Sequence, residues 1–353
     1  MPWREISANQ LNELKTPLII DVRSPCEHVV ENIPGSINVP LLSDIERAEV
    51  GTIYARQGEV AARNQALRII SPKIPAIVDQ ILRLRRRDQA LVIHCWRGGL
   101  RSEAVASFLS IVGIDCFRLV GGYKAWRRSV LSDFQEDAYS FIPLVLHGLT
   151  GVGKTEILQN LRSLGHEILD LEQLANHRGS AFGGLGLGNQ PTQKNFEAGL
   201  WSQMRTSRGQ PVFLEAESRK IGRLSLPDCI YGRIQQGRKI LVAGTISARA
   251  RRIVEEYTGL LPREAWTQAI ERLSSLKERL GSRRVQELKE MLISSQLFEA
   301  VQVLLLEYYD PLYSRQIERA RPFELEVCGD DAKAAADAIS AWLNELRTAS
   351  PVP

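Results

Sequence analysis

The sequence feature that most constrains the fold is GLTGVGKT, the stretch from Gly148 to Thr155. It follows the apolar run 143–147 and precedes a segment with helical spacing, so it marks a strand-to-helix turn. Backbone N–H groups and a helix N-terminus in such a turn bind anions. The predicted polyphosphate-binding residues are Gly148, Leu149, Thr150, Gly151, Val152, Gly153, Lys154 and Thr155. The motif predicts a di- or triphosphate ligand and leaves open whether that ligand is ATP.

Several polar side chains near this motif are candidates for chemistry. Lys154 would neutralise the outer phosphate oxygens, and Thr155 would ligate Mg²⁺. Glu215 closes the apolar run PVFLE and is the candidate acid for Mg²⁺ or a water, with Glu217 as the near alternative. Asp170 closes the run EILD and is a candidate substrate-facing acid. A solvated charge at a strand end explains Glu215 equally well.

Short apolar runs alternate with helical segments along most of the chain. Strands are expected within residues 16–23, 90–95, 116–126, 141–148, 167–170, 211–215 and 239–243. This alternation indicates an α/β fold with parallel sheets covered by helices. The polar segment 131–140 is interpreted as a linker. We therefore predict one α/β domain over residues 1–130 and a P-loop NTPase-like α/β domain over 141–353, with a helical region from about 247 to 353.

A second candidate site surrounds Cys95, in the stretch LVIHCWRGGLRS of residues 91–102. The cysteine ends a buried strand, and a glycine pair and a helix start follow it. Backbone N–H groups, the helix N-terminus and nearby arginines would hold an anion against the thiol. We predict Cys95 as catalytic, with an anion loop formed by Trp96, Arg97, Gly98, Gly99, Leu100 and Arg101. Two chemistries fit this pattern, phosphate-ester hydrolysis by a cysteine phosphatase and transfer of sulfur or selenium.

The sequence around this loop resembles the rhodanese family. The motifs that carry the resemblance are DVRSP (21–25), IPGSINVP (33–40) and LVGGYKAW (119–126). They occur in the family's order, which implies a rhodanese-like parallel-sheet domain over residues 1–130. The loop from Cys95 to Arg101 spans seven residues, whereas many rhodaneses have six. A wider loop suits a larger anion, such as a phosphate-like or selenophosphate-like group.

The two loops together resemble the bacterial tRNA 2-selenouridine synthase family. The supporting motifs are ANHRGSAFG (175–183) and FLEAESRKIG (213–222). The resemblance implies a transferase that exchanges sulfur for selenium in the wobble 2-thiouridine of tRNA, with selenophosphate as donor. It also implies geranylation of that sulfur from geranyl diphosphate, with S-geranyl-2-thiouridine as the intermediate.

The resemblance further implies site roles and partners. Selenophosphate would occupy the Cys95 loop, and geranyl diphosphate would occupy residues 148–155. His177 and Arg178 could contact tRNA, the diphosphate or the selenium donor. The implied partners are tRNA, through its anticodon region, and an enzyme that supplies selenophosphate. Basic residues that could form an RNA surface or a phosphate lid are Arg83, Arg85, Arg86, Arg87, Arg249, Arg251, Arg252, Arg283 and Arg284.

Three other functions remain open on the sequence. A cysteine phosphatase fused to a regulatory P-loop module would hydrolyse a generic aryl phosphate. A kinase with a binding-only rhodanese domain would turn over ATP with a small acceptor. An RNA-binding protein with a nucleotide switch would be indifferent to Cys95→Ser.

Composition narrows the compartment. Five cysteines are scattered without metal-ligand spacing, which is typical of buried residues in a reducing compartment. No apolar run approaches the roughly 20 residues of a membrane helix. A formal net charge of +4 permits a polyanionic partner. We therefore expect a cytoplasmic protein without a membrane partner.

Overall fold

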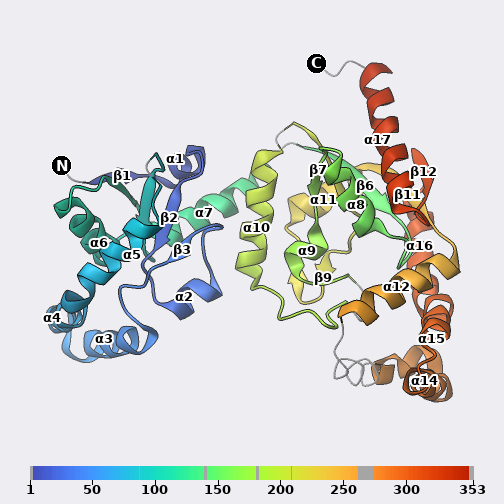
Figure 1. Cartoon of the computed structure of the whole chain (residues 1–353), viewed down its shortest axis with the longest axis horizontal. Helices are drawn as coiled ribbons and strands as arrows, with labels where there is room; N and C mark the ends of the chain where they lie inside the picture. Colours follow the sequence, from blue (N-terminus) through green and yellow to red (C-terminus); the bar gives the residue numbers. More distant parts are fainter. Residues whose placement is uncertain are drawn as a thin grey trace. The chain divides into compact units, whose positions relative to one another are not determined.

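The computed structural model divides the chain into two compact units (Figure 1). One comprises Met1–Ala138 with Glu197–Ser202, and the other comprises Tyr139–Phe196 with Gln203–Pro353. The structure describes residues 3–86, 88–138, 141–179, 183–207, 209–260 and 273–349. Each unit contains one five-stranded sheet, which confirms the predicted α/β class. Among the residues described, no helix combines the length and hydropathy that crossing a membrane requires.

The sheet of the first unit is parallel and has the order β1-β5-β4-β2-β3. Its strands are β1 (Trp3–Ile6), β2 (Leu18–Asp21), β3 (Ile37–Asn38), β4 (Leu91–His94) and β5 (Cys116–Leu119). Its helices are α1 (Ala8–Glu13), α2 (Pro25–Val30), α3 (Asp44–Gln57), α4 (Glu59–Ile70), η1 (Ser71–Lys73), α5 (Ile74–Leu84), α6 (Leu100–Ile111) and α7 (Gly122–Gln135).

The apolar runs of β2 and β4 are buried at every position because both faces of a parallel sheet are covered. Helix α5 contributes Ile77, Val78 and Ile81 to the same core. In the register of the two strands, Asp21 lies opposite His94. Parallel strands end at the same edge, so the residues that follow β2 and β4 meet there.

Helix α7 continues to Gln135, into the segment predicted as a linker. Its buried residues Tyr123, Trp126, Val130 and Phe134 recur at helical spacing, so the helix packs along one face to this point. Polar residues separate these buried positions, so the helical periodicity was not recognised in the sequence and the segment was interpreted as a linker. The first half of the predicted linker is therefore helical.

The sheet of the second unit is parallel and has the order β12-β11-β6-β8-β7. Its strands are β6 (Ile142–His147), β7 (Glu167–Leu169), β8 (Pro211–Glu215), β11 (Arg238–Ala243) and β12 (Leu325–Cys328), and β9 (Lys220–Ile221) and β10 (Leu224–Ser225) form a separate antiparallel pair. The helices before the last sheet strand are α8 (Lys154–Ser163), α9 (Leu171–Ala175), α10 (Gln193–Thr206), α11 (Asp228–Gln236), α12 (Ile246–Leu260), η2 (Ser274–Leu276), α14 (Lys277–Ile293), α15 (Leu297–Leu304), the π-helical turn η3 (Leu305–Tyr309) and α16 (Asp310–Ala320). Helix α17 (Ala332–Ala349) follows β12.

Among the residues described beyond 247, helices predominate as predicted, and strand β12 interrupts them. Strand β12 pairs with β11 at the edge of the sheet, where Ile240 lies opposite Leu325. The sequence analysis missed this strand because it has four residues, of which only Val327 is buried. Helices α12, α14, α15 and α16 gather at one end of this unit (Figure 1). Their apolar side chains form a core of their own, apart from the core beneath the sheet.

Candidate active sites

Cys95 follows β4 directly, and α6 begins five residues later at Leu100 with Gly99 as its N-cap. The cysteine is buried, and its Sγ lies 3.3 Å from Ser102 Oγ on the first turn of α6. Gly98 adopts a φ of +66°, which a residue with a side chain rarely tolerates. The structure thus shows the strand–loop–helix arrangement that the sequence predicted for this loop.

The two arginines of the loop differ in their surroundings. Arg97 is exposed to solvent. Arg101 makes a bidentate ion pair with Glu27, in which Nη1 lies 2.6 Å from Oε2 and Nη2 lies 3.3 Å from Oε1. Burial raises the pKa of Glu27, but hydrogen bonding to Arg101 and the charges of Arg101 and Arg47 hold it below its usual value. Because Arg101 is anchored to a carboxylate, only part of its charge is available to an anion.

The turn between β5 and α7 is hydrogen-bonded to the cysteine loop. The backbone N–H of Tyr123 donates to the Cys95 carbonyl at 2.8 Å, and that of Lys124 donates to the Trp96 carbonyl at 3.0 Å. A Cβ at Gly122 would lie 2.3 Å from the Cys95 carbonyl oxygen and 2.5 Å from the Gly98 nitrogen. In the sequence analysis, Gly122 served only as part of the motif LVGGYKAW, which supported the rhodanese resemblance. The structure shows that it allows two backbone segments to touch.

A buried charged network lies beside the loop. Arg23 is fully buried and pairs with Asp21 at 2.6 Å, and its guanidinium lies 4.6 Å from the Tyr123 ring centroid. Burial raises the pKa of Asp21, yet hydrogen bonds from His28 and Arg23 and the charge of Arg23 hold it far below its usual value. Burial lowers the pKa of His94 to about 4, so this histidine is neutral at physiological pH. His94 Nδ1, at the end of β4, lies 3.9 Å from Asp21 Oδ1, at the end of β2, so this network joins the two strand ends.

The P-loop motif connects β6 to α8, as predicted. Gly151 and Gly153 have φ values of +81° and +88°, and Lys154 Nζ donates to the Gly148 carbonyl at 3.1 Å. The N-terminus of α8 adds positive potential to the loop. All residues of the motif except Leu149 line one cavity. The Leu149 side chain instead packs against the core of the sheet.

Three carboxylates converge beside the P-loop. Thr155 Oγ1 lies 2.8 Å from Glu215 Oε1 and 3.3 Å from Glu172 Oε2. One oxygen from each of Glu172, Glu215 and Glu217 lies within 4.8 Å of the other two. Glu215, the candidate acid, therefore belongs to a cluster of three carboxylates with Glu172 and Glu217. Sequence reasoning missed Glu172, although it follows the end of β7 as Glu215 ends β8.

The electrostatics of these carboxylates follow from burial and mutual repulsion. Burial raises the pKa of Glu172 to about 10, and the charges of Glu215 and Glu217 add to the effect. Burial also raises the pKa of Glu215 to about 8, with Lys154 opposing the shift and Glu217 supporting it. Burial likewise raises the pKa of Glu217. A cation among these side chains would relieve their repulsion.

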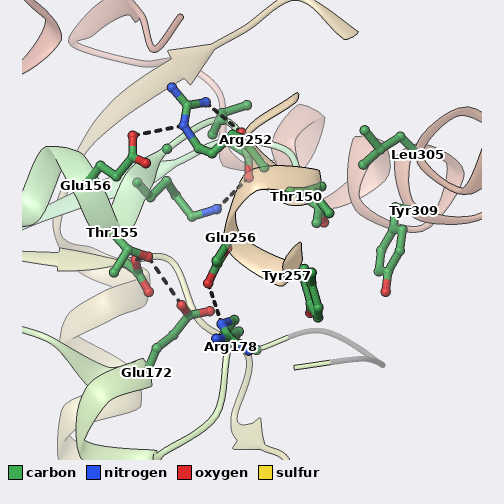
Figure 2. A pocket seen from close by; sticks show the side chains of 18 of the residues that line it. Thr150, Thr155, Glu156, Glu172, Arg178, Arg252, Glu256, Tyr257, Leu305 and Tyr309 are labelled. Carbon is green, nitrogen blue, oxygen red and sulfur yellow. Dashed lines mark hydrogen bonds and ion pairs between the residues drawn. The ribbon is translucent and has the colours of Figure 1, made fainter. Parts of the chain in front are cut away.

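The remaining predicted site residues also line this cavity, in different ways. Asp170 caps α9, accepting from the Gln173 backbone N–H and from Gln159 Nε2, both at 2.9 Å. Arg178 forms an ion pair with Glu256 and packs over the Tyr257 ring (Figure 2). His177 lies beside it in the sequence and also lines the cavity. Residues 180–182, in the glycine-rich segment that follows Arg178, lie outside the described residues.

The cavity has a volume of about 770 Å³ and two chemical halves. One half is the P-loop with the three glutamates. The other half is apolar and comes mainly from α12, α15, η3 and α16. Among its residues are Ile253, Tyr257, Val301, Leu305, Tyr309 and Tyr313. Figure 2 shows Leu305 and Tyr309 across the cavity from Thr155 and Glu172. Nothing in the sequence pattern had indicated this apolar chamber.

Two of the three arginines after β11, Arg249 and Arg252, contact backbone carbonyls of the P-loop. Arg249 is buried, donates to the Thr150 carbonyl at 2.8 Å and pairs with both carboxylate oxygens of Asp310. Arg252 donates to the Gly151 carbonyl at 2.8 Å. Buried guanidinium groups need such partners, which the P-loop carbonyls provide. These two arginines therefore fasten the P-loop to α12.

The other arginines considered for an RNA surface differ in their exposure and ion pairing. Arg284 pairs with Glu287 and Glu307 on the helical region, so its charge is neutralised locally. Arg251 is exposed. Arg87 lies outside the described residues.

Two family models match the chain. The rhodanese-like domain matches residues 6–129, and the tRNA 2-selenouridine synthase AAA domain matches residues 142–347. Among solved structures, the N-terminal domain of a protein described as ATP/GTP binding, from Clostridium difficile 630, is 36% identical with a TM-score of 0.34. It covers 36% of this chain and 98% of its own.

Curated relatives match nearly the whole chain. The tRNA 2-selenouridine synthase of Shewanella denitrificans is 34% identical in an alignment that covers 93% of this chain and 94% of that protein. The protein of the same name from Nitrosomonas europaea is 32% identical in an alignment that covers 87% of this chain and 90% of its own. The chain therefore belongs to the tRNA 2-selenouridine synthase family, with an N-terminal rhodanese domain followed by an AAA (P-loop) domain.

Proposed function

We propose that this chain replaces sulfur with selenium in the wobble 2-thiouridine of tRNA, using selenophosphate and an S-geranyl-2-thiouridine intermediate. The observation that carries the proposal is the cavity in which a P-loop adjoins an apolar chamber. A ligand with a diphosphate head and a hydrocarbon tail, such as geranyl diphosphate, complements both halves. ATP complements only the polar half, because it has no hydrocarbon tail to cover the apolar wall.

In the first step, the sulfur of 2-thiouridine attacks the first carbon of the geranyl chain. The carbon–oxygen bond breaks, diphosphate leaves with the bonding electrons, and the base releases its N3 proton. Lys154 and the N–H groups of residues 148–155 would stabilise the negative charge that develops on the diphosphate. Alkylation turns the thiocarbonyl into a thioether-like group, whose sulfur leaves more readily in the second step.

Mg²⁺ fits the acidic half of the cavity. Glu215 Oε2 is buried and has no hydrogen-bond partner among the described residues. Together with Thr155, Glu172 and Glu217, it offers the oxygen ligands that Mg²⁺ prefers. When bound, the cation would neutralise charge on the leaving diphosphate. We propose Thr155 and Glu215 as the principal ligands.

In the second step, the selenium of selenophosphate attacks C2 of the base, and the C2–sulfur bond breaks. Geranyl thiolate leaves, and water then cleaves the phosphorus–selenium bond to release phosphate. The loop of Trp96, Arg97, Gly98, Gly99, Leu100 and Arg101 would hold the donor's phosphate group. Cys95, at the base of this loop, would contact the selenium and act as the catalytic residue.

The other predicted site residues receive positioning roles. Both carboxylate oxygens of Asp170 are engaged with Gln159 and Gln173, which supports a structural role in the cavity wall. Arg178, tethered to Glu256, and His177 would border the entering substrate. The tRNA and an enzyme that supplies selenophosphate are the partners that this function requires.

Nucleoside mass spectrometry tests the proposal. Purified protein, Mg²⁺ and geranyl diphosphate are incubated with tRNA that contains 2-thiouridine, with and without selenophosphate. We expect a geranyl mass gain without the donor and the selenium-for-sulfur shift when the donor is present. ATP in place of geranyl diphosphate should give neither product. A folded protein that modifies no nucleoside under either condition would contradict the proposal.

A further inference from the structure

The apolar half of the cavity contains an uncommon element. The π-helical turn η3 connects α15 to α16. Such turns account for well under 1% of residues in proteins and are frequent at functional sites. Leu305 and Tyr309, at the two ends of the turn, are only 1% and 6% exposed, and both line the cavity. The neighbouring Leu306 is 57% exposed and does not line it.

The side chains of this turn form a closely packed wall. Tyr309 stacks on Tyr313 with ring centroids 6.4 Å apart and an interplanar angle of 11°. Tyr308 meets Tyr309 edge to face at 5.1 Å. Leu305 belongs to the core shared by α12, α14 and α15. Rings held on two sides cannot swing aside easily, because protein interiors are close-packed.

A wall of this kind limits the length of a tail that lies against it. A hydrocarbon chain gains free energy for each carbon that it buries, as long as space remains. Once the space is filled, further carbons must displace packed side chains, which is unfavourable. Figure 2 shows Leu305 and Tyr309 on the side of the cavity away from Glu172, where such a tail would extend.

We propose that Leu305 and Tyr309, held by the π-helical turn, set the longest hydrocarbon tail that the diphosphate substrate can carry. This inference rests on the proposed function, because it requires a prenyl diphosphate in the cavity. Leu305 is the better probe, since its outward neighbour Leu306 provides a matched control.

The test compares prenyl transfer from dimethylallyl, geranyl and farnesyl diphosphate to 2-thiouridine tRNA. The quantity measured is the ratio of kcat/KM for farnesyl to that for geranyl diphosphate. Leu305→Ala should raise this ratio at least about tenfold over the wild type, in line with pocket discrimination by a few methylenes. Leu306→Ala should leave it unchanged, because that side chain points to solvent.

Leu305→Phe provides the opposite change and does not open a hole in the core. It should lower geranyl transfer more than dimethylallyl transfer. An unchanged chain-length preference in both Leu305 variants, with folding verified by circular dichroism, would overturn the inference while leaving the proposed function intact. No prenyl transfer by the wild type from any of the three diphosphates would instead overturn the proposed function, and this inference with it.

Discussion

At the scale of the residue, Gly122 decides whether the cysteine loop can form. Its φ is +58°, and a Cβ at this position would lie only 2.3 Å from the Cys95 carbonyl oxygen, so both its backbone and its surroundings exclude a side chain. Gly113 also has a positive φ, of +78°, but no atom lies within 4 Å of its Cβ position. A side chain at Gly113 would therefore cause backbone strain alone, whereas a side chain at Gly122 would cause both backbone strain and a steric clash.

We predict that Gly122→Ala abolishes selenium transfer to tRNA that already carries S-geranyl-2-thiouridine. The cause is displacement of the backbone at Cys95. Gly113→Ala should cost only about 1–2 kcal/mol of folding free energy, the strain of a left-handed residue, and should retain activity. Selenation assays with thermal unfolding as the control distinguish the two. Wild-type selenation by a folded Gly122→Ala protein would contradict the assignment of this contact.

Glu215 provides a pH-dependent prediction for the metal-free protein. Its pKa, raised mainly by burial to about 8, exceeds that of an unfolded glutamate at about 4.3. The folded state therefore binds the proton more tightly than the unfolded state. This stabilisation is fully present below the unfolded pKa and is lost as pH rises through the folded pKa. Without metal, the contribution of Glu215 should consequently lower Tm as pH rises from about 4.3 to about 8.

Differential scanning calorimetry in the presence of a chelator would measure this fall in Tm. Glu215→Gln should reduce the pH dependence, whereas Glu345→Gln, at an exposed position, should preserve it. Adding Mg²⁺ at about pH 8.5 should raise the Tm of the wild type more than that of Glu215→Gln. Identical responses of the two variants to pH and Mg²⁺ would argue against a cation site at Glu215.

At the scale of the element, α12 connects the two halves of the cavity. Arg249, near its start, contacts the P-loop at Thr150 and the first residue of α16 at Asp310. Ile253, one turn later, is close enough to meet a Cβ at Gly151, and Tyr257 faces the apolar chamber. One helix thus positions the phosphate loop, the chamber wall and the helix that follows the π-helical turn.

We predict that Arg249→Met weakens the P-loop and lowers folding stability by about 3 kcal/mol, because it leaves Asp310 and a loop carbonyl without their partner. The affinity for diphosphate, measured by calorimetry, should fall as well. Arg251→Met removes the same charge from an exposed position and should change either quantity little. Equal effects of the two substitutions would show that net charge, rather than the buried contact, is responsible.

At the scale of the whole molecule, the two candidate sites belong to separate units, each with its own parallel sheet. Cys95 follows the strand β4 of one sheet, and Lys154 begins helix α8 after the strand β6 of the other. Neither site takes a described side chain from the other sheet. This division predicts that the two half-reactions can be lost independently.

Cys95→Ser should abolish selenation but leave geranylation within about twofold of the wild type. Lys154→Ala should lower geranylation at least about tenfold, through the loss of a charge-assisted contact to the diphosphate. It should spare selenation of tRNA geranylated beforehand. Cys26→Ser, which alters an exposed cysteine, is the control. Loss of both half-reactions in the folded Cys95→Ser protein would show that the sites do not divide the work in this way.

Local sequence determined both loops. In each, an apolar run, a glycine with positive φ and a helix start are neighbours along the chain, so short-range sterics and hydrogen bonding specify the turn. Most strands of the two five-stranded sheets were predictable for the same reason, but the short edge strands β1 and β12 were not. The family resemblance added the expected substrates, which no local rule contains.

Only the tertiary structure brought together the acidic cluster, the arginine clamp and the apolar chamber. Thr155 and Glu215 are 60 residues apart, and Arg249 and Thr150 are 99 residues apart. Hydrophobic periodicity shows which face of a helix is buried but not which distant segment covers it. Leu305 and Leu306 are adjacent residues of the same type. Only packing places one in the wall of the cavity and the other on the surface.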